Sequence, residues 1–267
     1  MILIFLWIAL QLIGESWPIS SSGHLLLFED LGLLYNSKDP VWIFNGQTYI
    51  EWTLSGVHAI IVLIWYYIQS RGYLKNFNYN SIPSITLSLL LRIAWADIIT
   101  ATAYLITYVA PIHSFFPLCL GFMITFFSLI STCIISRGSK TTFTFADATV
   151  LGLVQSCALI PGISRLATTY TAARVRGYNH YYAFALSWAL QIPLALAAGT
   201  LSIIKGTTNQ TWLNFFSSPV IVTWCLIAAV FAYLSLSLVE YLGTKNAWYI
   251  VAIYLLVPIS ICLRYGV

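Results

Sequence analysis

The sequence predicts an all-α polytopic membrane protein with two halves related as an inverted repeat, each containing a re-entrant helical hairpin and transmembrane spans. Three observations support this fold class. Hydrophobic residues make up 60% of the 267 residues and charged residues only 7%, whereas about a quarter of the residues in soluble domains are charged. Several apolar stretches have the roughly 20 residues needed to cross a bilayer. Two shorter apolar stretches are each interrupted by a polar, proline-containing segment.

The first polar segment runs from residue 11 to residue 24 and reads Gln-Leu-Ile-Gly-Glu-Ser-Trp-Pro-Ile-Ser-Ser-Ser-Gly-His. The apolar runs on either side are too short to span a bilayer, which predicts a hairpin that enters the membrane and returns. Gln11 and Glu15 would share one face of a helix, and Pro18 would end that helix. Polar groups at hydrocarbon depth are costly and usually functional, so this segment is the main candidate for a site.

The rest of the first half alternates spans and loops. We expect a loop over 29–49 and spans at 50–69, 82–110 and 115–135. Arg92 and Asp97 interrupt the second of these spans, which predicts a bend or a short helix before it. The two charges are expected to neutralise each other or to cap a kink, with an ion relay as the alternative. His58 and His113 are expected to be packing and surface residues.

The second half begins near Asp147 and follows the same order. A short apolar stretch at 148–160 leads to a break at Pro161, and spans are expected at 182–204, 220–239 and 247–263. In both halves a glutamine precedes the proline of the break by six or seven residues, and a serine follows it. Interrupted segments at corresponding positions are typical of inverted repeats that meet at a central site. We therefore treat 1–267 as a single membrane domain with pseudo-repeat halves of about 1–140 and 141–267.

Together the two breaks supply groups suited to a phosphate ligand. They contain the carboxylate of Glu15, the imidazole of His24, the guanidinium of Arg165 and several hydroxyls. Serines before Gly23 can leave backbone N–H groups free as an anion cradle, and the arginine fork suits a pair of phosphate oxygens. The net charge of +4 fits the cationic loops of membrane proteins and gives no basic run that would indicate nucleic acid binding. The five cysteines are scattered singly, which predicts neither a disulfide nor a zinc site.

Both breaks resemble the signatures of one known family, the undecaprenyl-pyrophosphate phosphatases, or bacitracin-resistance proteins, of bacterial inner membranes. The first break is similar to that family's (Glu/Gln)-x-x-x-Glu and Pro-Ile-Ser-Ser-Thr-Gly-His signature. The second resembles its Asp-Ala, Gly-Leu-x-Gln and Ala-Leu-Ile-Pro-Gly-Thr-Ser-Arg-Ser-Gly pattern. The matching residues are Gln11, Glu15, Pro18 to His24, Asp147, Ala148, Gly152 to Gln155, and Ala158 to Arg165. Length and hydropathy fit along the whole chain.

The resemblance implies an undecaprenyl-diphosphatase, a multi-pass enzyme of the bacterial inner (cytoplasmic) membrane. It would remove the terminal phosphate of undecaprenyl pyrophosphate and recycle the lipid carrier of peptidoglycan synthesis. Its implied partners are the polyprenyl pyrophosphate lipid, the bilayer and a divalent cation, Mg²⁺ or Ca²⁺, and its site would open toward the extracytoplasmic side. Monomer and homodimer are both compatible with the sequence. Catalytic residues on this interpretation are Glu15, Ser21, His24 and Arg165. Phosphate-binding residues are Ser20, Ser22, Gly23, Ser164, Arg165 and Thr168. Metal ligands are Glu15 and Gln11.

Three routes for the chemistry follow from these residues. Ser21 could attack after His24 removes its proton, His24 could itself form a phosphohistidine, or a metal-activated water could attack directly. We favour Ser21 with His24 as the base. The cations and donors of the site would stabilise charge that builds on the phosphoryl oxygens.

One departure from the family pattern bears on activity. Leu166 and Ala167 stand where the family usually has Ser-Gly. One hydroxyl is lost, the methyl of Ala167 would crowd the cradle, and Thr168 or Thr169 would have to replace the missing donor. Two alternatives to the hydrolase therefore remain, a lipid or solute transporter with inverted repeats and a catalytically weakened relative.

Overall fold

The computed structural model describes residues 2–32, 42–73, 82–109, 116–135 and 138–266. Within these residues the chain is helical apart from turns, connecting loops and one isolated bridge between Lys140 and Tyr178. The helices of the first half are α1 (Ile2–Ser16), α2 (Ser21–Asp30), α3 (Trp42–Tyr73), α4 (Ile82–Val109) and α5 (Leu118–Ile134). Those of the second half are α6 (Phe145–Cys157), α7 (Arg165–Val175), α8 (His180–Gly206), α9 (Gln210–Ser217), α10 (Pro219–Thr244) and α11 (Trp248–Tyr265).

Five of the described helices, α3, α4, α8, α10 and α11, are long and apolar enough to cross a membrane. The helices α1, α5 and α6 are apolar but shorter, with 15, 17 and 13 residues. Large hydrophobic side chains are exposed on the outer faces of the long helices, including Leu90, Ile98 and Leu105 on α4. Such faces are stable only against lipid or another apolar surface. The prediction of a multi-pass, all-helical membrane protein is therefore confirmed.

Several predicted boundaries were wrong. The expected loop over 29–49 is shorter, because α2 continues to Asp30 and α3 already begins at Trp42. The expected full span over 115–135 appears as the 17-residue α5. The short helix α9 was not predicted, because its eight residues carry a polar and an apolar face rather than an apolar run. His113 lies outside the described residues.

The interruption predicted within 82–110 is also absent, since α4 is one continuous helix. Arg92 and Asp97 do not neutralise each other. The guanidinium of Arg92 donates to the carbonyl of Phe143 and lies 5.7 Å from the ring centroid of Phe145. Asp97 instead accepts a hydrogen bond from Gln155 on α6, at 3.1 Å. Each charge thus has its own partner in another part of the chain, and α4 continues through both positions.

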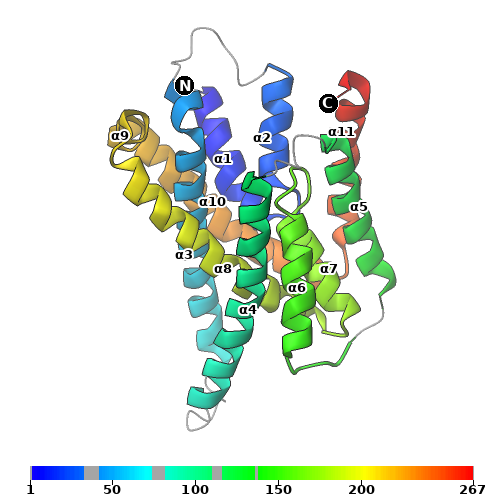
Figure 1. The fold of residues 1–267 in the computed structure, drawn as a ribbon. Helices are drawn as coiled ribbons and strands as arrows, with labels where there is room; N and C mark the ends of the chain where they lie inside the picture. Colours follow the sequence, from blue (N-terminus) through cyan, green and yellow to red (C-terminus); the bar gives the residue numbers. More distant parts are fainter. Residues whose placement is uncertain (1, 33–41, 74–81, 110–115, 136–137, 267) are drawn as a thin grey trace.

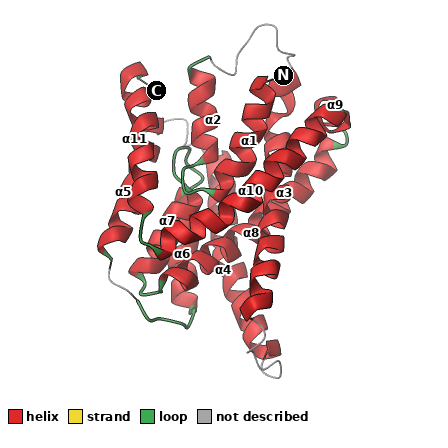
Figure 2. Cartoon of the chain, turned by 180° about the vertical axis from the view of Figure 1, so that it is seen from behind, coloured by secondary structure: helices red, strands yellow, loops and turns green. Residues whose placement is uncertain are grey.

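Glycines bring the two polar breaks together in the interior. Figure 2 shows loop segments beside α2, inside the bundle. A Cβ atom added to Gly23 would lie 2.7 Å from the Cα and N atoms of Gly162, and one added to Gly121 would lie 2.2 Å from the Pro161 carbonyl oxygen. Gly162 also has a φ of 86°, which favours glycine. The two breaks therefore contact each other through backbone, without side chains between them.

Four pairs of helices form the main contacts of the fold. The most extensive contacts join α3 with α8, α4 with α6, α5 with α11, and α1 with α10. Both ends of the chain lie at the same end of the molecule, beside α1 and α11 (Figure 1).

Asp147, which begins the second motif, lies at a structural ion-pair cluster and not at the cavity described below. Its carboxylate accepts from Lys140 Nζ at 2.7 Å, Arg176 Nε at 2.7 Å and the Tyr178 hydroxyl at 2.8 Å. It also completes a capping box with Thr144 at the start of α6. Burial alone would raise the pKa of Asp147, but the hydrogen bonds from Lys140, Thr144 and Tyr178 hold the pKa of this carboxyl well below its usual range. The cluster fixes the start of α6 against the end of α7.

Candidate active site

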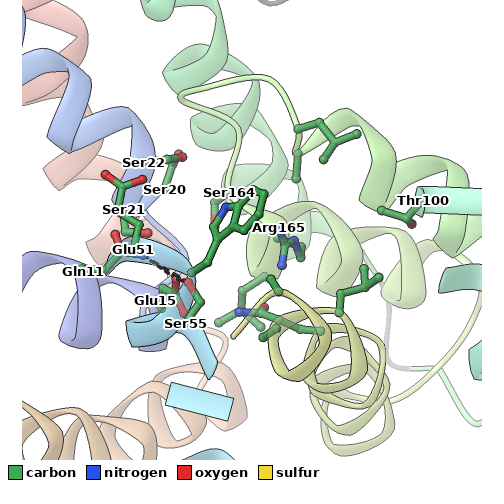
Figure 3. Close-up of a pocket in the computed structure, with 18 of the residues that line it drawn as sticks. Gln11, Glu15, Ser20, Ser21, Ser22, Glu51, Ser55, Thr100, Ser164 and Arg165 are labelled. Atoms are coloured by element: carbon green, nitrogen blue, oxygen red, sulfur yellow. Dashed lines mark hydrogen bonds between the residues drawn. The ribbon is translucent and has the colours of Figure 1, made fainter. Parts of the chain in front are cut away.

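A cavity of about 520 Å³ lies beside the two breaks. Its polar lining residues, the polar wall, come from both halves of the chain, and Figure 3 labels most of them. They are Gln11, Glu15, Ser20, Ser21, Ser22, Glu51, Ser55, Thr100, Ser164, Arg165 and Gln191. Its apolar lining residues, the apolar wall, come mostly from α3, α4 and α8 and include Trp52, Tyr104, Leu194, Ala198 and Leu201. The cavity therefore suits a ligand with a charged head and an apolar body.

The structure brings together most of the predicted site residues. Seven of them line the cavity, namely Gln11, Glu15, Ser20, Ser21, Ser22, Ser164 and Arg165. Three of them, Gly23, His24 and Thr168, are buried beside it and do not line it. These three need a different explanation from direct contact with a ligand.

Glu15 is held by side chains from its own helix and from α3. Its Oε1 atom accepts from Gln11 Nε2 at 2.8 Å and from the Ser55 hydroxyl. The Gln11 amide also donates to Ser55 Oγ at 3.3 Å. The second carboxylate oxygen, Oε2, and the amide oxygen of Gln11 are buried and have no hydrogen-bond partner. Buried acceptors of this kind are rare and call for a ligand or a water.

These unpartnered oxygens fit a hard divalent cation. Mg²⁺ and Ca²⁺ take oxygen ligands, and Mg²⁺ usually keeps several waters and takes few protein carboxylates. Glu15 and Gln11 present two such oxygens, and Glu51 adds a carboxylate to the same wall. The described residues contain no group of three or more His, Cys, Asp or Glu side chains that could hold a metal alone. The donor set therefore matches an ion that is completed by water and substrate oxygens.

Two helix N-termini border the cavity. Ser20 caps α2 and accepts the Gly23 N–H at 3.3 Å, while Ser164 caps α7 and accepts the Ala167 N–H at 3.3 Å. The first N–H groups of a helix have no partner within it, and the helix dipole favours an anion there. Ser20 has a φ of 64°, an unusual value for a residue with a side chain and one that is common at functional sites. The two caps thus offer a site for phosphate oxygens.

Gly23 was predicted to bind phosphate, and the structure gives it another role. Its N–H is already bonded to Ser20, and its Cα lies against Gly162. Gly23 therefore sets the distance between the two breaks. The N–H groups left at the start of α2 belong to Ser21 and Ser22, both of which line the cavity.

Arg165 is the cation of the site. It lies at the first position of α7 and interacts electrostatically with Glu15 and Asp97, two carboxylates on different helices. In Figure 3 Arg165 lies between Glu15 on one side and Thr100 on the other. Its Nε atom is buried without a hydrogen-bond partner, so part of its donor fork remains available to an anion.

A polar layer behind Arg165 was not expected from the sequence. Gln155 donates to Asp97 Oδ1 at 3.1 Å and lies 3.1 Å from Thr100 Oγ1. Asp97 Oδ2 and Gln155 Oε1 have no hydrogen-bond partner. Asp97 is therefore a buried counter-charge for Arg165. A carboxylate buried on a spanning helix needs such a partner.

His24 does not contact Ser21 as the predicted nucleophile and base would. Its Nδ1 lies 2.8 Å from the Ser20 carbonyl oxygen and its Nε2 3.1 Å from the Tyr254 hydroxyl. The ring stacks on Tyr254 and meets the edge of Phe122. A carbonyl only accepts, so Nδ1 carries a proton, and in the neutral ring Nε2 accepts from the tyrosine. Both ring nitrogens are engaged away from Ser21, which makes His24 a support for the Ser20 loop in this structure.

Thr168 and Thr169 do not replace the missing hydroxyl of the family pattern. Thr168 donates to the Ser164 carbonyl at 2.9 Å, and Thr169 to the Arg165 carbonyl at 2.7 Å. Ala167 is fully buried and outside the cavity lining, so its methyl does not crowd the phosphate cradle. Leu166 does line the cavity and adds an apolar surface where the family usually has a hydroxyl.

The sequence interpretation missed the contribution of α3. Glu51, Ser55 and His58 follow one another at helical spacing and share a face, and this stripe in an apolar span was a usable signal. Glu51 and Ser55 line the cavity, and His58 lies behind Glu15 with 1% of its side chain exposed. His58 was expected to be a packing residue, but it takes part in a buried polar network.

Comparisons with known proteins agree with this geometry. The undecaprenyl-diphosphatase of Thermosipho africanus (strain TCF52B) is 31% identical over 207 residues, which cover 75% of this chain and 78% of that protein. That of Acidovorax ebreus (strain TPSY) is 27% identical over 262 residues, or 92% and 89% of the two chains. That of Enterococcus faecalis is 28% identical over 202 residues, or 72% and 71%. Residues 5–259 match the family described as bacitracin resistance protein BacA. With its two motifs at one cavity and this match along nearly its whole length, the chain belongs to the bacitracin resistance protein BacA family.

Proposed function

We propose that this protein is an undecaprenyl-diphosphatase, which hydrolyses undecaprenyl pyrophosphate to undecaprenyl phosphate and inorganic phosphate within the membrane. The observation that carries the proposal is a cavity that combines polar and apolar lining. Glu15, Arg165 and two helix N-termini border it, and apolar residues of spanning helices line much of the rest. Family membership and the names of the relatives support the same activity. The product is a lipid carrier of cell-wall synthesis, and its recycling accounts for bacitracin resistance.

The chain's own residues would bind the pyrophosphate by charge and by backbone. Arg165 would pair with phosphate oxygens through its fork of donors, and the N-termini of α2 and α7 would supply N–H groups and favourable dipoles. In phosphoryl transfer such positioned donors carry most of the catalysis, because charge spreads over the phosphoryl oxygens as the bond to the leaving group breaks. Leu166 and the apolar wall would exclude water from the phosphate on the lipid side.

Glu15 and Gln11 would hold a divalent cation, Mg²⁺ or Ca²⁺. When bound, the cation would neutralise charge on the pyrophosphate oxygens. Glu15 suits this function because Ser55 and Gln11 occupy only its Oε1 atom and leave Oε2 for a ligand.

For the attacking group we propose Ser21. It lines the cavity at the start of α2, whereas His24 is buried outside the lining with both ring nitrogens engaged. Ser21 Oγ would form a bond to the terminal phosphorus as the bond to the lipid phosphate oxygen breaks. Its proton would pass to a carboxylate of the polar wall, and water would then hydrolyse the phosphoserine to inorganic phosphate. Direct attack by water is the alternative, and trapping of a phosphorylated protein during turnover of labelled substrate distinguishes the two.

The membrane arrangement is part of the proposal. The helix pairs α1–α2 and α6–α7 would be re-entrant hairpins of an inverted repeat, supported by the serine cap that begins the second helix of each pair. The protein would lie in the bacterial inner membrane with the cavity open toward the extracytoplasmic side. A Ser22→Cys variant tests this orientation, because an impermeant thiol reagent added to intact spheroplasts should label it. Protection until the cells are lysed would reverse the orientation.

The experiment that tests the activity measures phosphate release from undecaprenyl pyrophosphate by the purified protein in detergent. Release should require Mg²⁺ or Ca²⁺, stop with EDTA, and fall to background in Glu15→Gln and Arg165→Ala. Lys245→Ala, which removes an exposed cation far from the cavity, should release phosphate at the wild-type rate. A well-folded wild-type protein that released none would overturn the proposal. In that case, activity in Leu166→Ser would identify a catalytically weakened relative, and substrate transport without hydrolysis would identify a carrier.

A further inference from the structure

A buried histidine lies directly behind the acidic residue of the cavity. His58 Nδ1 is 3.5 Å from Glu15 Oε2, and His58 Nε2 is 2.9 Å from Ser16 Oγ. Only 1% of the His58 side chain is exposed, and Ser16 is fully buried. His58 does not line the cavity, so it cannot contact a ligand there. Any effect on the reaction must pass through Glu15.

The hydrogen bonds of His58 define how its ring is oriented. Ser16 Oγ lies 2.9 Å from His58 Nε2 and 3.3 Å from the Ala232 carbonyl oxygen, and its single proton can go to either of them. An ionised carboxylate only accepts, so Nδ1 carries the proton that faces Glu15, and in the neutral ring Nε2 accepts from Ser16. Trp188 packs against the ring, with centroids 5.5 Å apart. The ring is therefore held on both sides with its N–H directed at Glu15.

The Glu15 carboxylate is consequently held from two directions. Ser55 and Gln11 fix its Oε1 atom from the cavity side, and His58 faces its Oε2 atom from the core. At 3.5 Å the contact with His58 is longer than a hydrogen bond and acts as an electrostatic restraint. Without it, the Glu15 carboxylate could rotate away from its orientation at the cavity.

We propose that His58 is a positioning residue for Glu15, whose carboxylate it holds through its Nδ1–H in the orientation that serves the divalent cation and the pyrophosphate. The inference rests on the proposed function, since it assigns a role within the same site. Partners behind a metal ligand fix its orientation, and their loss typically reduces metal affinity or activity by about 10- to 100-fold. Ser16 supports Glu15 indirectly, because it holds the His58 ring in place.

The test compares three variants of the full-length protein in detergent with magnesium as the probe. His58→Leu removes the N–H and keeps much of the volume. His58→Asn restores an amide N–H near the place of Nδ1. Trp65→Phe is the matched control, because Trp65 lies two turns further along the same face of α3, is itself buried, and loses one part-buried hydrogen bond, to Ser237 Oγ at 2.9 Å. For each variant we would measure kcat, KM for undecaprenyl pyrophosphate, the magnesium concentration giving half-maximal activity, and thermal stability with and without magnesium.

We expect His58→Leu to lower kcat by about 10- to 100-fold and to raise the half-maximal magnesium concentration, with little change in KM. His58→Asn should recover part of both losses, and Trp65→Phe should retain wild-type values. Wild-type kcat and magnesium dependence in His58→Leu, beside an inactive Glu15→Gln, would overturn the inference while the proposed function stands. Equal losses in all three variants, matching a fall in thermal stability, would also overturn it, because the role would then be structural. An inactive wild-type protein would instead count against the proposed function.

Discussion

Replacing Gly23 with alanine should separate the two breaks and thereby slow the reaction. The added Cβ would lie 2.7 Å from the Cα and N atoms of Gly162 and 3.1 Å from Phe122 Cζ. Favourable contacts between carbon atoms occur at about 3.5–4.0 Å, so the breaks must move apart by about 1 Å. The two nearest atoms, both of Gly162, are backbone, which cannot rotate away as a side chain could.

This displacement changes the site because each break carries part of it. Ser20, Ser21 and Ser22 lie on one break and Arg165 on the other. A misplacement of about 1 Å can reduce a rate by about 10²-fold, which is about 2.7 kcal/mol in the activation free energy. Overpacking should also lower the free energy of unfolding by about 1–3 kcal/mol, partly offset by the roughly 1 kcal/mol by which helices favour alanine over glycine.

The assay is phosphate release from undecaprenyl pyrophosphate, measured beside thermal unfolding in the same detergent. Gly206→Ala is the matched control, because its Cβ would lie 2.7 Å from the Trp212 ring, outside the cavity lining. The control should lose stability and keep its kcat. If Gly23→Ala kept kcat within about threefold of wild type, contact between the breaks would not set the geometry of the phosphate site, and the reasoning would be refuted.

Three further predictions follow from the site and its surroundings. Arg165→Lys should lower kcat/KM by about 10²-fold or more, because a point charge cannot reproduce the fork; near-normal kinetics would exclude pairing through the fork. His24→Gln should retain much more activity than His24→Ala if His24 supports the Ser20 loop, whereas equal loss in both would indicate a proton-transfer role. The folded-state pKa of Asp147 is lowered, so its stabilisation is complete above the unfolded pKa of about 4 and is lost as the pH falls below it. Asp147→Asn should lower Tm at pH 7 and flatten the fall of Tm below pH 4, and an unchanged acid profile would contradict this.

The fold could be predicted well from the sequence because membrane helices have a strong signal. Long apolar runs gave the spans 50–69, 182–204, 220–239 and 247–263, which agree with α3, α8, α10 and α11 within a few residues of the apolar segment. The signal failed where a charge within an apolar run suggested an interruption. Arg92 and Asp97 find partners on other helices, and tertiary contacts of this kind leave no trace in local sequence.

Part of the site could be predicted because polar residues are easy to recognise in an apolar sequence. Polar residues next to prolines were recognisable at both breaks, and seven of the ten predicted residues meet at the cavity. What could not be predicted was the direction of each side chain. His24 is adjacent to the serines in sequence, yet its ring points to Tyr254, 230 residues away. The backing of Glu15 by Ser55 and His58 likewise depends on how α3 packs against α1.

The volume and lining of the cavity indicate how much of a very long lipid substrate it can hold. A volume of about 520 Å³ is that of a site for a drug-sized molecule, which is enough for the pyrophosphate and the start of a polyprenyl chain. Two residues of its apolar wall, Tyr104 on α4 and Leu201 on α8, are about 40% exposed. We expect this side of the cavity to open toward lipid, because both helices are long and apolar enough to cross a membrane. The rest of the polyprenyl chain can stay in the bilayer, because moving it from lipid to an apolar protein surface would gain little free energy. On the proposed function, recognition would then depend on the charged head and the first isoprene units, and only the head would need to reach the buried polar groups Arg165 and Glu15.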